Sequence, residues 1–273
     1  MSPTSNFTDA TLKGSVTGPT FTGSVDGAKF TGSVTTADTP VPPDPTGPTG
    51  GLITAFNPAH WGVTTIDGVT YHAHTYGNSE SYGKKKLDDY TIRYEIRQGT
   101  GGWNNTVDVS ELECAQHLHD GDPVTIAYRI MVEPGAANSS SWMVCGIEWH
   151  NDDSQSPTYT SPMFVTEALG DKFSVVIRYP KNGNISPSGC TMKRLWTAPS
   201  NFVRGQWYIF EIEAKPSLNN GYFRCKVDGV QVANYTGPVG YGYDGYGMFG
   251  LYRNAAPETF AIQIKNLTVS WAK

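Results

Sequence analysis

The chain has 273 residues, enough for one large all-β domain with an appendage or for two modest domains. Its formal net charge of −5 argues against a nucleic-acid-binding protein, which normally presents a basic face. The sequence has no apolar stretch near the roughly 20 residues that cross a bilayer, so we expect no membrane partner. The 30 Gly, 18 Pro and 15 Tyr are typical of short strands joined by tight turns.

The N-terminal segment, residues 1–39, contains a nine-residue repeat. Gly-Ser-Val recurs in it at residues 14–16, 23–25 and 32–34. Three such short units cannot bury a core alone, so we interpret this segment either as an arm for attachment or oligomerisation or as a flexible tail. Residues 40–50 are rich in Pro and Gly, which is typical of a semi-rigid linker. The predicted main domain therefore runs from residue 51 to residue 273.

Within the main domain, apolar and polar side chains alternate with the period of a β-strand. These runs lie at residues 91–97, 124–132, 143–150, 173–179, 208–212, 223–227 and 260–271. Asp228-Gly229 follows one run and is typical of a two-residue hairpin turn. Many short strands with regular turns predict an all-β fold, a jelly-roll sandwich of two antiparallel sheets.

Two strands carry side chains suited to proton transfer. Glu148 and His150 lie two residues apart in one strand and therefore share a face. A histidine there can act as a general base near neutral pH, or it can be a surface histidine that Glu148 satisfies. In a second, glycine-lined strand, Tyr252 offers a phenol and Arg253 a guanidinium that can bind a carboxylate. The alternative for this pair is a structural role at the rim of the sandwich.

Other charged or metal-binding side chains allow further interpretations. Glu111 and Glu113 share a face, as the carboxylate pair of a retaining glycosidase does. Arg93, Glu95 and Arg97 alternate along a strand, which usually indicates a solvated face or cross-strand ion pairs. Two histidines at residues 72 and 74 also share a face, but a zinc site needs a third ligand.

Taken in order, the motifs resemble those of the heparin-lyase-like and glucuronan-lyase-like jelly-roll polysaccharide lyases. The resemblance covers roughly residues 52–273 and rests on the segments 93–97, 110–112, 120–124, 132–134, 148–150, 205–208, 227–229 and 250–253. It implies β-elimination at a uronic acid: a base removes the C5 proton, a cation stabilises the charge, and an acid protonates the O4 leaving group.

Carried over by position, the resemblance assigns roles to single residues. His150 matches the histidine of the family, Tyr252 matches its catalytic tyrosine, and Arg93 falls in its Arg-x-Glu strand, so these three are the predicted catalytic residues. The predicted substrate-binding residues are Arg97, Glu148, Trp149, Arg178, Arg253 and Asn254.

Two positions depart from the family pattern. Val109 stands where the family often has Arg, and Glu148 stands where it often has Gln. Both positions help to neutralise the substrate carboxylate, so the clamp is expected from Arg253, Arg178 or the lysines at residues 84–86. Glu148 would repel a uronate unless it is paired or protonated.

The sequence thus predicts a lyase acting on an acidic exo- or capsular polysaccharide. Two alternatives remain: a glycoside hydrolase that uses Glu111 with Glu113 or Glu148, and a non-catalytic module that binds glycan. The arm and the absence of an apolar signal segment favour a virion-associated or otherwise extracellular protein, with the arm attaching it or forming a homo-oligomer. We expect no cofactor, with Asn151-Asp152-Asp153 as the candidate for a structural calcium ion. Cys145 and Cys225 lie in apolar-alternating runs and are expected to be buried free thiols.

Overall fold

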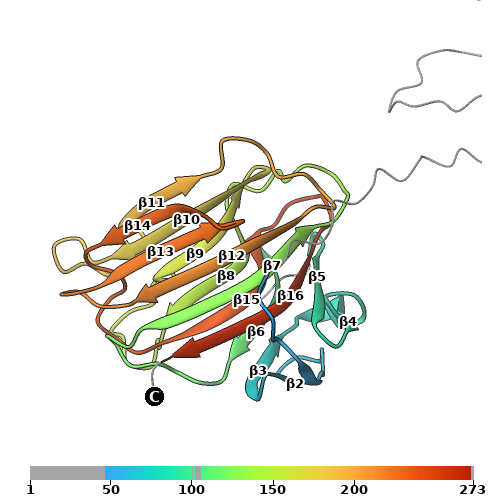
Figure 1. The fold of residues 1–273 in the computed structure, drawn as a ribbon, viewed down its shortest axis with the longest axis horizontal. Coiled ribbons are helices and arrows are strands. Elements are labelled where there is room, and N and C mark those ends of the chain that lie inside the picture. The colour runs from blue at the N-terminus through green and yellow to red at the C-terminus, as the bar shows by residue number, and fades with distance from the viewer. Residues whose placement is uncertain (1–46, 100, 102–105, 272–273) are drawn as a thin grey trace, which may run out of the picture. The chain divides into compact units, whose positions relative to one another are not determined.

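The computed structural model describes residues 47–99, 101 and 106–271. The predicted arm and residues 40–46 of the predicted linker lie outside these residues. The described part consists of two antiparallel sheets that stack on one another (Figure 1). Its helical content is one 3₁₀ turn, Gly77–Ser81, and it contains no helix long and apolar enough to cross a membrane.

The larger sheet has nine strands. In spatial order they are β1 (Ile53–Ala55), β2 (Val63–Ile66), β3 (Val69–His74), β6 (Val107–Cys114), β15 (Gly245–Asn254), β8 (Met143–Asn151), β9 (Phe164–Leu169), β10 (Lys172–Tyr179) and β11 (Thr191–Thr197). The central neighbours β6, β15 and β8 are far apart in sequence because the chain crosses between the sheets.

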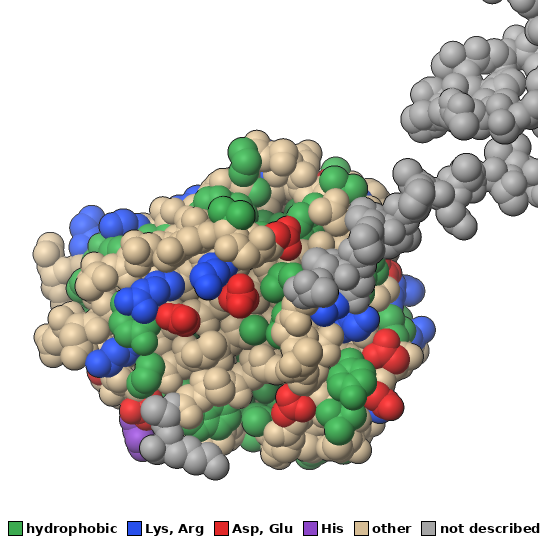
Figure 2. All heavy atoms as spheres, viewed as in Figure 1, with side chains coloured by type: hydrophobic (Ala, Val, Ile, Leu, Met, Phe, Trp, Pro, Cys, Tyr) green, Lys and Arg blue, Asp and Glu red, His purple; other side chains and the backbone are tan. Residues whose placement is uncertain are grey.

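The smaller sheet has seven strands. Their order is β14 (Val230–Thr236), β13 (Tyr222–Val227), β12 (Trp207–Lys215), β7 (Val124–Val132), β16 (Phe260–Trp271), β5 (Thr91–Ile96) and β4 (Lys84–Asp88). Figure 2 shows the face of the molecule that this sheet forms, where basic and acidic side chains are interspersed. The predicted sandwich of two antiparallel sheets is confirmed.

Alternation along the strands builds the core between the sheets. On β7 every second residue from Val124 to Val132 is buried, and the residues between them are more exposed. Burial of each large apolar side chain contributes roughly 1.5–3 kcal/mol. Tyr128 stacks on Phe210 of the neighbouring strand at 5.5 Å between ring centroids. Its hydroxyl also lies 3.0 Å from Thr166 Oγ1 of the other sheet, so one polar contact crosses the core.

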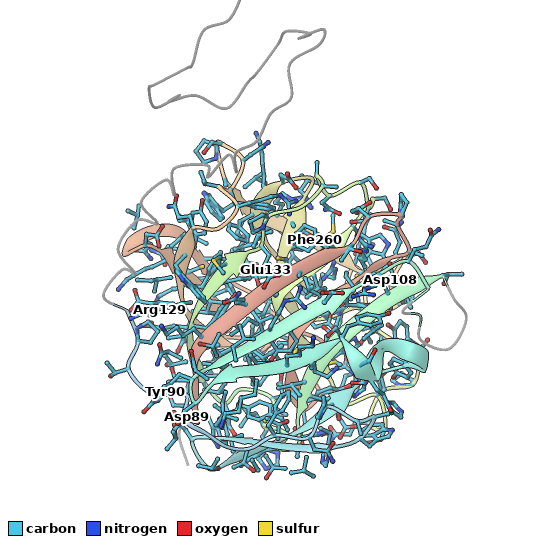
Figure 3. All side chains as sticks on the ribbon, turned by 90° about the vertical axis from the view of Figure 1, so that its right-hand side faces the viewer. Asp89, Tyr90, Asp108, Arg129, Glu133 and Phe260 are labelled. Carbon is cyan, nitrogen blue, oxygen red and sulfur yellow. The ribbon has the colours of Figure 1, made fainter. Side chains whose placement is uncertain are left out.

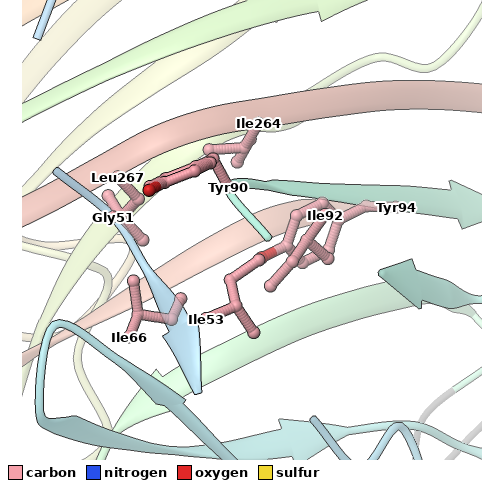
Figure 4. A pocket seen from close by; sticks show the side chains of 8 residues that line it. All are labelled: Gly51, Ile53, Ile66, Tyr90, Ile92, Tyr94, Ile264 and Leu267. Atoms are coloured by element: carbon pink, nitrogen blue, oxygen red, sulfur yellow. The ribbon is translucent and has the colours of Figure 1, made fainter. Parts of the chain in front are cut away.

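Turns and the chain entry follow the local sequence. Asp228 and Gly229 both have positive φ, 51° and 76°, and connect β13 to β14 as the predicted two-residue hairpin. Where the chain enters the sandwich, Ile53, Ile264 and Leu267 line a small apolar pocket (Figure 4). The four cysteines are free thiols, and the predicted burial of Cys145 and Cys225, for example, is confirmed.

Candidate active site

The candidate site lies on the face of the nine-stranded sheet that points away from the core. Strand β8 runs through its centre, and all of its residues are buried, on the outer face as well as the inner one. Ile147 and Trp149 point into the core, so Glu148 and His150 point outward. The register places Glu148 beside Met248 and His150 beside Tyr246 of β15.

Two glycines make a flat floor in the middle of this face. Gly250 of β15 pairs with Gly146 of β8 on one side and with Glu111 of β6 on the other. Both glycines have positive φ, 143° and 117°, and a Cβ on either would lie within 3 Å of another atom. Neither position accepts a side chain, because the added Cβ would meet Tyr128 and Thr166 at Gly146 and the Ser110 carbonyl at Gly250.

Glu111 and Glu148 form a buried acidic pair beside this floor. Their exposed fractions are 1% and 2%. Burial, followed by the charge of Glu148, raises the pKa of Glu111 well above its usual range, and burial raises the pKa of Glu148 to about 8. Within the described part of the chain, Glu111 Oε1 and Glu148 Oε2 have no hydrogen-bond partner. At neutral pH Glu148 is therefore mainly a carboxylic acid that can donate a hydrogen bond.

Tyrosines surround the acidic pair and also remain protonated. Burial, together with a smaller contribution from the nearby carboxyl groups, raises the pKa of Tyr76 and of Tyr159 to about 12. Burial likewise raises the pKa of Tyr246 and Tyr252, and the charge of Glu148 acts in the same direction on both. The phenols around Glu148 are therefore proton donors across the whole physiological range.

His150 is a neutral imidazole between two of these phenols. Burial lowers its pKa to about 4, and the charge of Arg178 lowers it as well. Its ring is stacked against Tyr246 and tilted against Tyr159, with 6.0 Å between ring centroids in each case. A neutral imidazole can accept a proton at once, whereas a protonated one cannot.

Two basic side chains act on the acidic pair, and burial lowers the pKa of one of them, Lys84, to about 7. The charge of Arg178 on β10 opposes the raised pKa of Glu148, and its Nη1 donates to the Pro162 carbonyl at 3.0 Å. Buried Lys84 acts in the same way on Glu111, and its Nζ donates to the His74 carbonyl at 2.5 Å. Of the predicted sources of a carboxylate clamp, Arg178 and Lys84 thus lie at the site.

The predicted metal ligands are engaged with other side chains. His74 Nε2 lies 2.7 Å from Glu113 Oε2 and its Nδ1 lies 3.3 Å from the Tyr76 hydroxyl. Asp152 accepts hydrogen bonds from Ser154 and contacts His117 at 3.0 Å. In the described residues no three His, Cys, Asp or Glu side chains gather as a metal site requires.

Arg93 and Arg97 lie on the other sheet, which corrects their predicted roles. Arg93 belongs to β5, where its Nη2 is 2.8 Å from Glu133 Oε2, and Glu133 is labelled in Figure 3. Arg97 pairs with Glu95 and lies 3.9 Å above the Tyr82 ring. The core separates β5 from His150, so neither arginine reaches a sugar there. The alternating charges make ion pairs, as the other interpretation expected.

Three predicted substrate contacts are structural instead. Arg253 shares the inward face of β15 with Phe249 and Leu251, is fully buried, and lies 3.0 Å from Asp108, which is labelled in Figure 3. Trp149 points into the core and stacks on an aromatic ring there. Asn254 Oδ1 accepts hydrogen bonds from the backbone of the adjoining loop.

On β15 the tyrosine beside His150 is Tyr246, which the sequence did not single out. Tyr252 does share the outward face with His150, but it pairs with Val144 at the other end of β8. The two tyrosines are six positions apart on β15, roughly 20 Å of extended strand. Alternation alone places both on one face, and only the register between β15 and β8 shows which of them is adjacent to His150.

No protein-family profile matches the chain, and no curated protein matches it in sequence. Among solved structures it is similar to the endo-β-1,4-glucuronan lyase of the fungus Trichoderma reesei, with 12% identity and a TM-score of 0.56 over 80% of this chain and 95% of that one. The chain has the jelly-roll fold of that lyase. An alginate lyase of Pseudomonas aeruginosa also matches, with 19% identity and a TM-score of 0.49 over 68% of this chain and 88% of that one. At these identities the similarity establishes the fold, and the chemistry rests on the site.

Proposed function

We propose that the protein is a polysaccharide lyase that cleaves a uronic-acid-containing polymer by β-elimination. The observation that carries the proposal is the neutral imidazole of His150, stacked on the Tyr246 ring on the same outer face of the sheet as protonated Glu148. The glucuronan lyase with the same fold acts on a uronic acid polymer, which supports this substrate class. Fold alone would not select a reaction.

Glu148 and Arg178 would bind the uronate carboxylate. A protonated carboxyl group donates a hydrogen bond to a carboxylate, as the amide of a glutamine would, and the guanidinium adds a charge-assisted bond. The repulsion expected from an ionised Glu148 therefore does not arise below its pKa of about 8. These hydrogen bonds neutralise the carboxylate and stabilise the negative charge that develops on it, so the C5 proton of the sugar becomes more acidic.

His150 and Tyr246 would then move the protons. The imidazole accepts the C5 proton, the C–H electron pair forms the C4–C5 double bond, and the C4–O4 bond breaks. Tyr246 donates its phenolic proton to O4, which becomes the hydroxyl of the leaving fragment. The products are an unsaturated uronate and a new reducing end, and no co-reactant is needed.

The test is a screen of uronate polymers, beginning with glucuronan and alginate. We expect cleavage with the ultraviolet absorbance of an unsaturated uronate, and no cleavage of the same polymer after its carboxyl groups are reduced to alcohols. Cleavage without that absorbance would favour a hydrolase. The raised pKa of Glu111 and of Glu148 disfavours either of them as the ionised nucleophile of a retaining hydrolase.

The pH profile should identify Glu148 as a proton donor. We expect activity to fall as the pH rises through about 8, because ionised Glu148 repels the uronate. Glu148→Gln keeps the donor without the titration, so this variant should remain active above that pH. A Glu148→Gln profile with an unchanged alkaline limb would contradict the role.

The stability of the same variant provides a control. Folded Glu148 keeps its proton up to about pH 8, while a glutamate in the unfolded chain loses it at about 4.3. Stability therefore decreases as the pH rises between these two values, because the unfolded state binds fewer protons there. In Glu148→Gln this contribution to the pH dependence of the thermal midpoint should be absent.

Such a polymer occurs outside cells, so we propose an extracellular or virion-associated enzyme acting on exopolysaccharide or capsule. Attachment or oligomerisation through residues 1–39 remains a prediction from the repeat. Deletion of these residues is expected to remove attachment or assembly without removing activity, because the candidate site lies wholly within β3 to β15 and their connecting loops.

A further inference from the structure

Trp61 is an exposed aromatic residue in a costly backbone conformation. Its exposed fraction is 53%, and it takes no part in the hydrophobic core. Its φ of 60° lies in the left-handed region, which a bulky residue rarely adopts. Backbone hydrogen bonds hold it there: its N–H donates to the Ala73 carbonyl at 2.8 Å, and the Ala73 N–H donates to Gly62 at 2.9 Å. The fold thus holds a strained tryptophan in solvent, a combination that often marks a functional residue.

The indole lies over the outward face of β3, on the same side of the sheet as the acidic pair. Its ring centroid is 5.0 Å from that of His74 and 5.9 Å from that of His72. The register places His74 beside Glu111 of β6, so Trp61 is in line with the pair across the strands. Three strand spacings separate β3 from β8, roughly 14 Å. Strands β2 and β3 lie at one edge of the sandwich (Figure 1).

We propose that Trp61 forms a remote sugar subsite, on which a pyranose ring of the bound polysaccharide stacks several units away from the bond that is cleaved. The proposal rests on the proposed function for the identity of the polymer. An indole offers a broad apolar face to the C–H face of a sugar ring, and its rigidity limits the entropy lost on binding. A chain that crosses the strands from β3 toward β10 passes Trp61, the glycine floor and Arg178 in that order.

The test uses Trp61→Gly, which removes the ring and also relieves the strain. We expect its thermal midpoint to equal or exceed that of the wild type, because glycine adopts positive φ without cost. Binding of polymeric glucuronan or alginate, measured by calorimetry in a His150→Ala background to prevent cleavage, should weaken roughly tenfold. With His150 intact, Trp61→Gly should cleave short oligomers that span only the catalytic centre at nearly the wild-type rate.

Asn182→Gly is the matched control. Asn182 also has a positive φ of 51°, and its substitution by glycine removes no aromatic ring. It should leave polymer binding unchanged. Equal polymer binding by the wild type and Trp61→Gly would overturn the subsite. An absence of polymer binding by the wild type would also overturn it, and so would a marked loss of stability in Trp61→Gly. Failure of the lyase proposal has a different result: polymer binding that depends on Trp61, with no unsaturated product.

Discussion

His150→Ala is expected to lower turnover of a uronate polymer by about 10²–10⁴-fold, the usual contribution of a general base. The imidazole has a pKa of about 4, so it is unprotonated at neutral pH, and it lies between Tyr159 and Tyr246. The loss should fall on kcat more than on KM, because Glu148 and Arg178 still bind the carboxylate. Formation of unsaturated product at saturating polymer is the measurement.

His119→Ala is the matched control for this variant. His119 is largely exposed and pairs with Asp244 at 3.0 Å, away from the acidic pair. It should keep turnover close to that of the wild type. Near-full activity of His150→Ala, with its fold intact, would show that another group takes the C5 proton.

The sequence predicted the sandwich and half of the candidate site for one reason. Strand alternation reports which side chains share a face, so Glu148 and His150 could be placed together without coordinates. The same placement shows where the chain departs from the family pattern, because Glu148 stands where the family often has a glutamine. Burial then explains how the departure is compatible with a uronate, since it keeps Glu148 protonated.

The remaining site residues depend on long-range pairing, which alternation does not encode. Arg93 alternates as clearly as Glu148 does, but nothing local to its strand indicates which of the two sheets it joins. Arg253 is misassigned because a polar residue can also face inward, where it is fully buried and bound to Asp108. The charge of Lys84 acts on Glu111 from a strand of the opposite sheet, and no spacing in the sequence predicts that the two residues are neighbours.

The two tyrosines of β15 give the most direct test of the register. Tyr246→Phe removes the hydroxyl beside His150, so we expect a loss in kcat of about 10²–10⁴-fold. Tyr252→Phe removes the hydroxyl of the tyrosine that pairs with Val144, and the centroid of its ring lies 4.9 Å from that of Trp142. Its main effect should be a rise in KM of a few-fold, with kcat nearly unchanged.

Both substitutions keep the aromatic ring, so each serves as the other's structural control. The rings remain in van der Waals contact with their neighbours, and the thermal midpoints should stay close to that of the wild type. A large loss in Tyr252→Phe with little effect in Tyr246→Phe would move the proton donor to the other end of β8. The leaving oxygen would then lie beside Val144, six positions from His150 along β8, which is roughly 20 Å of extended strand.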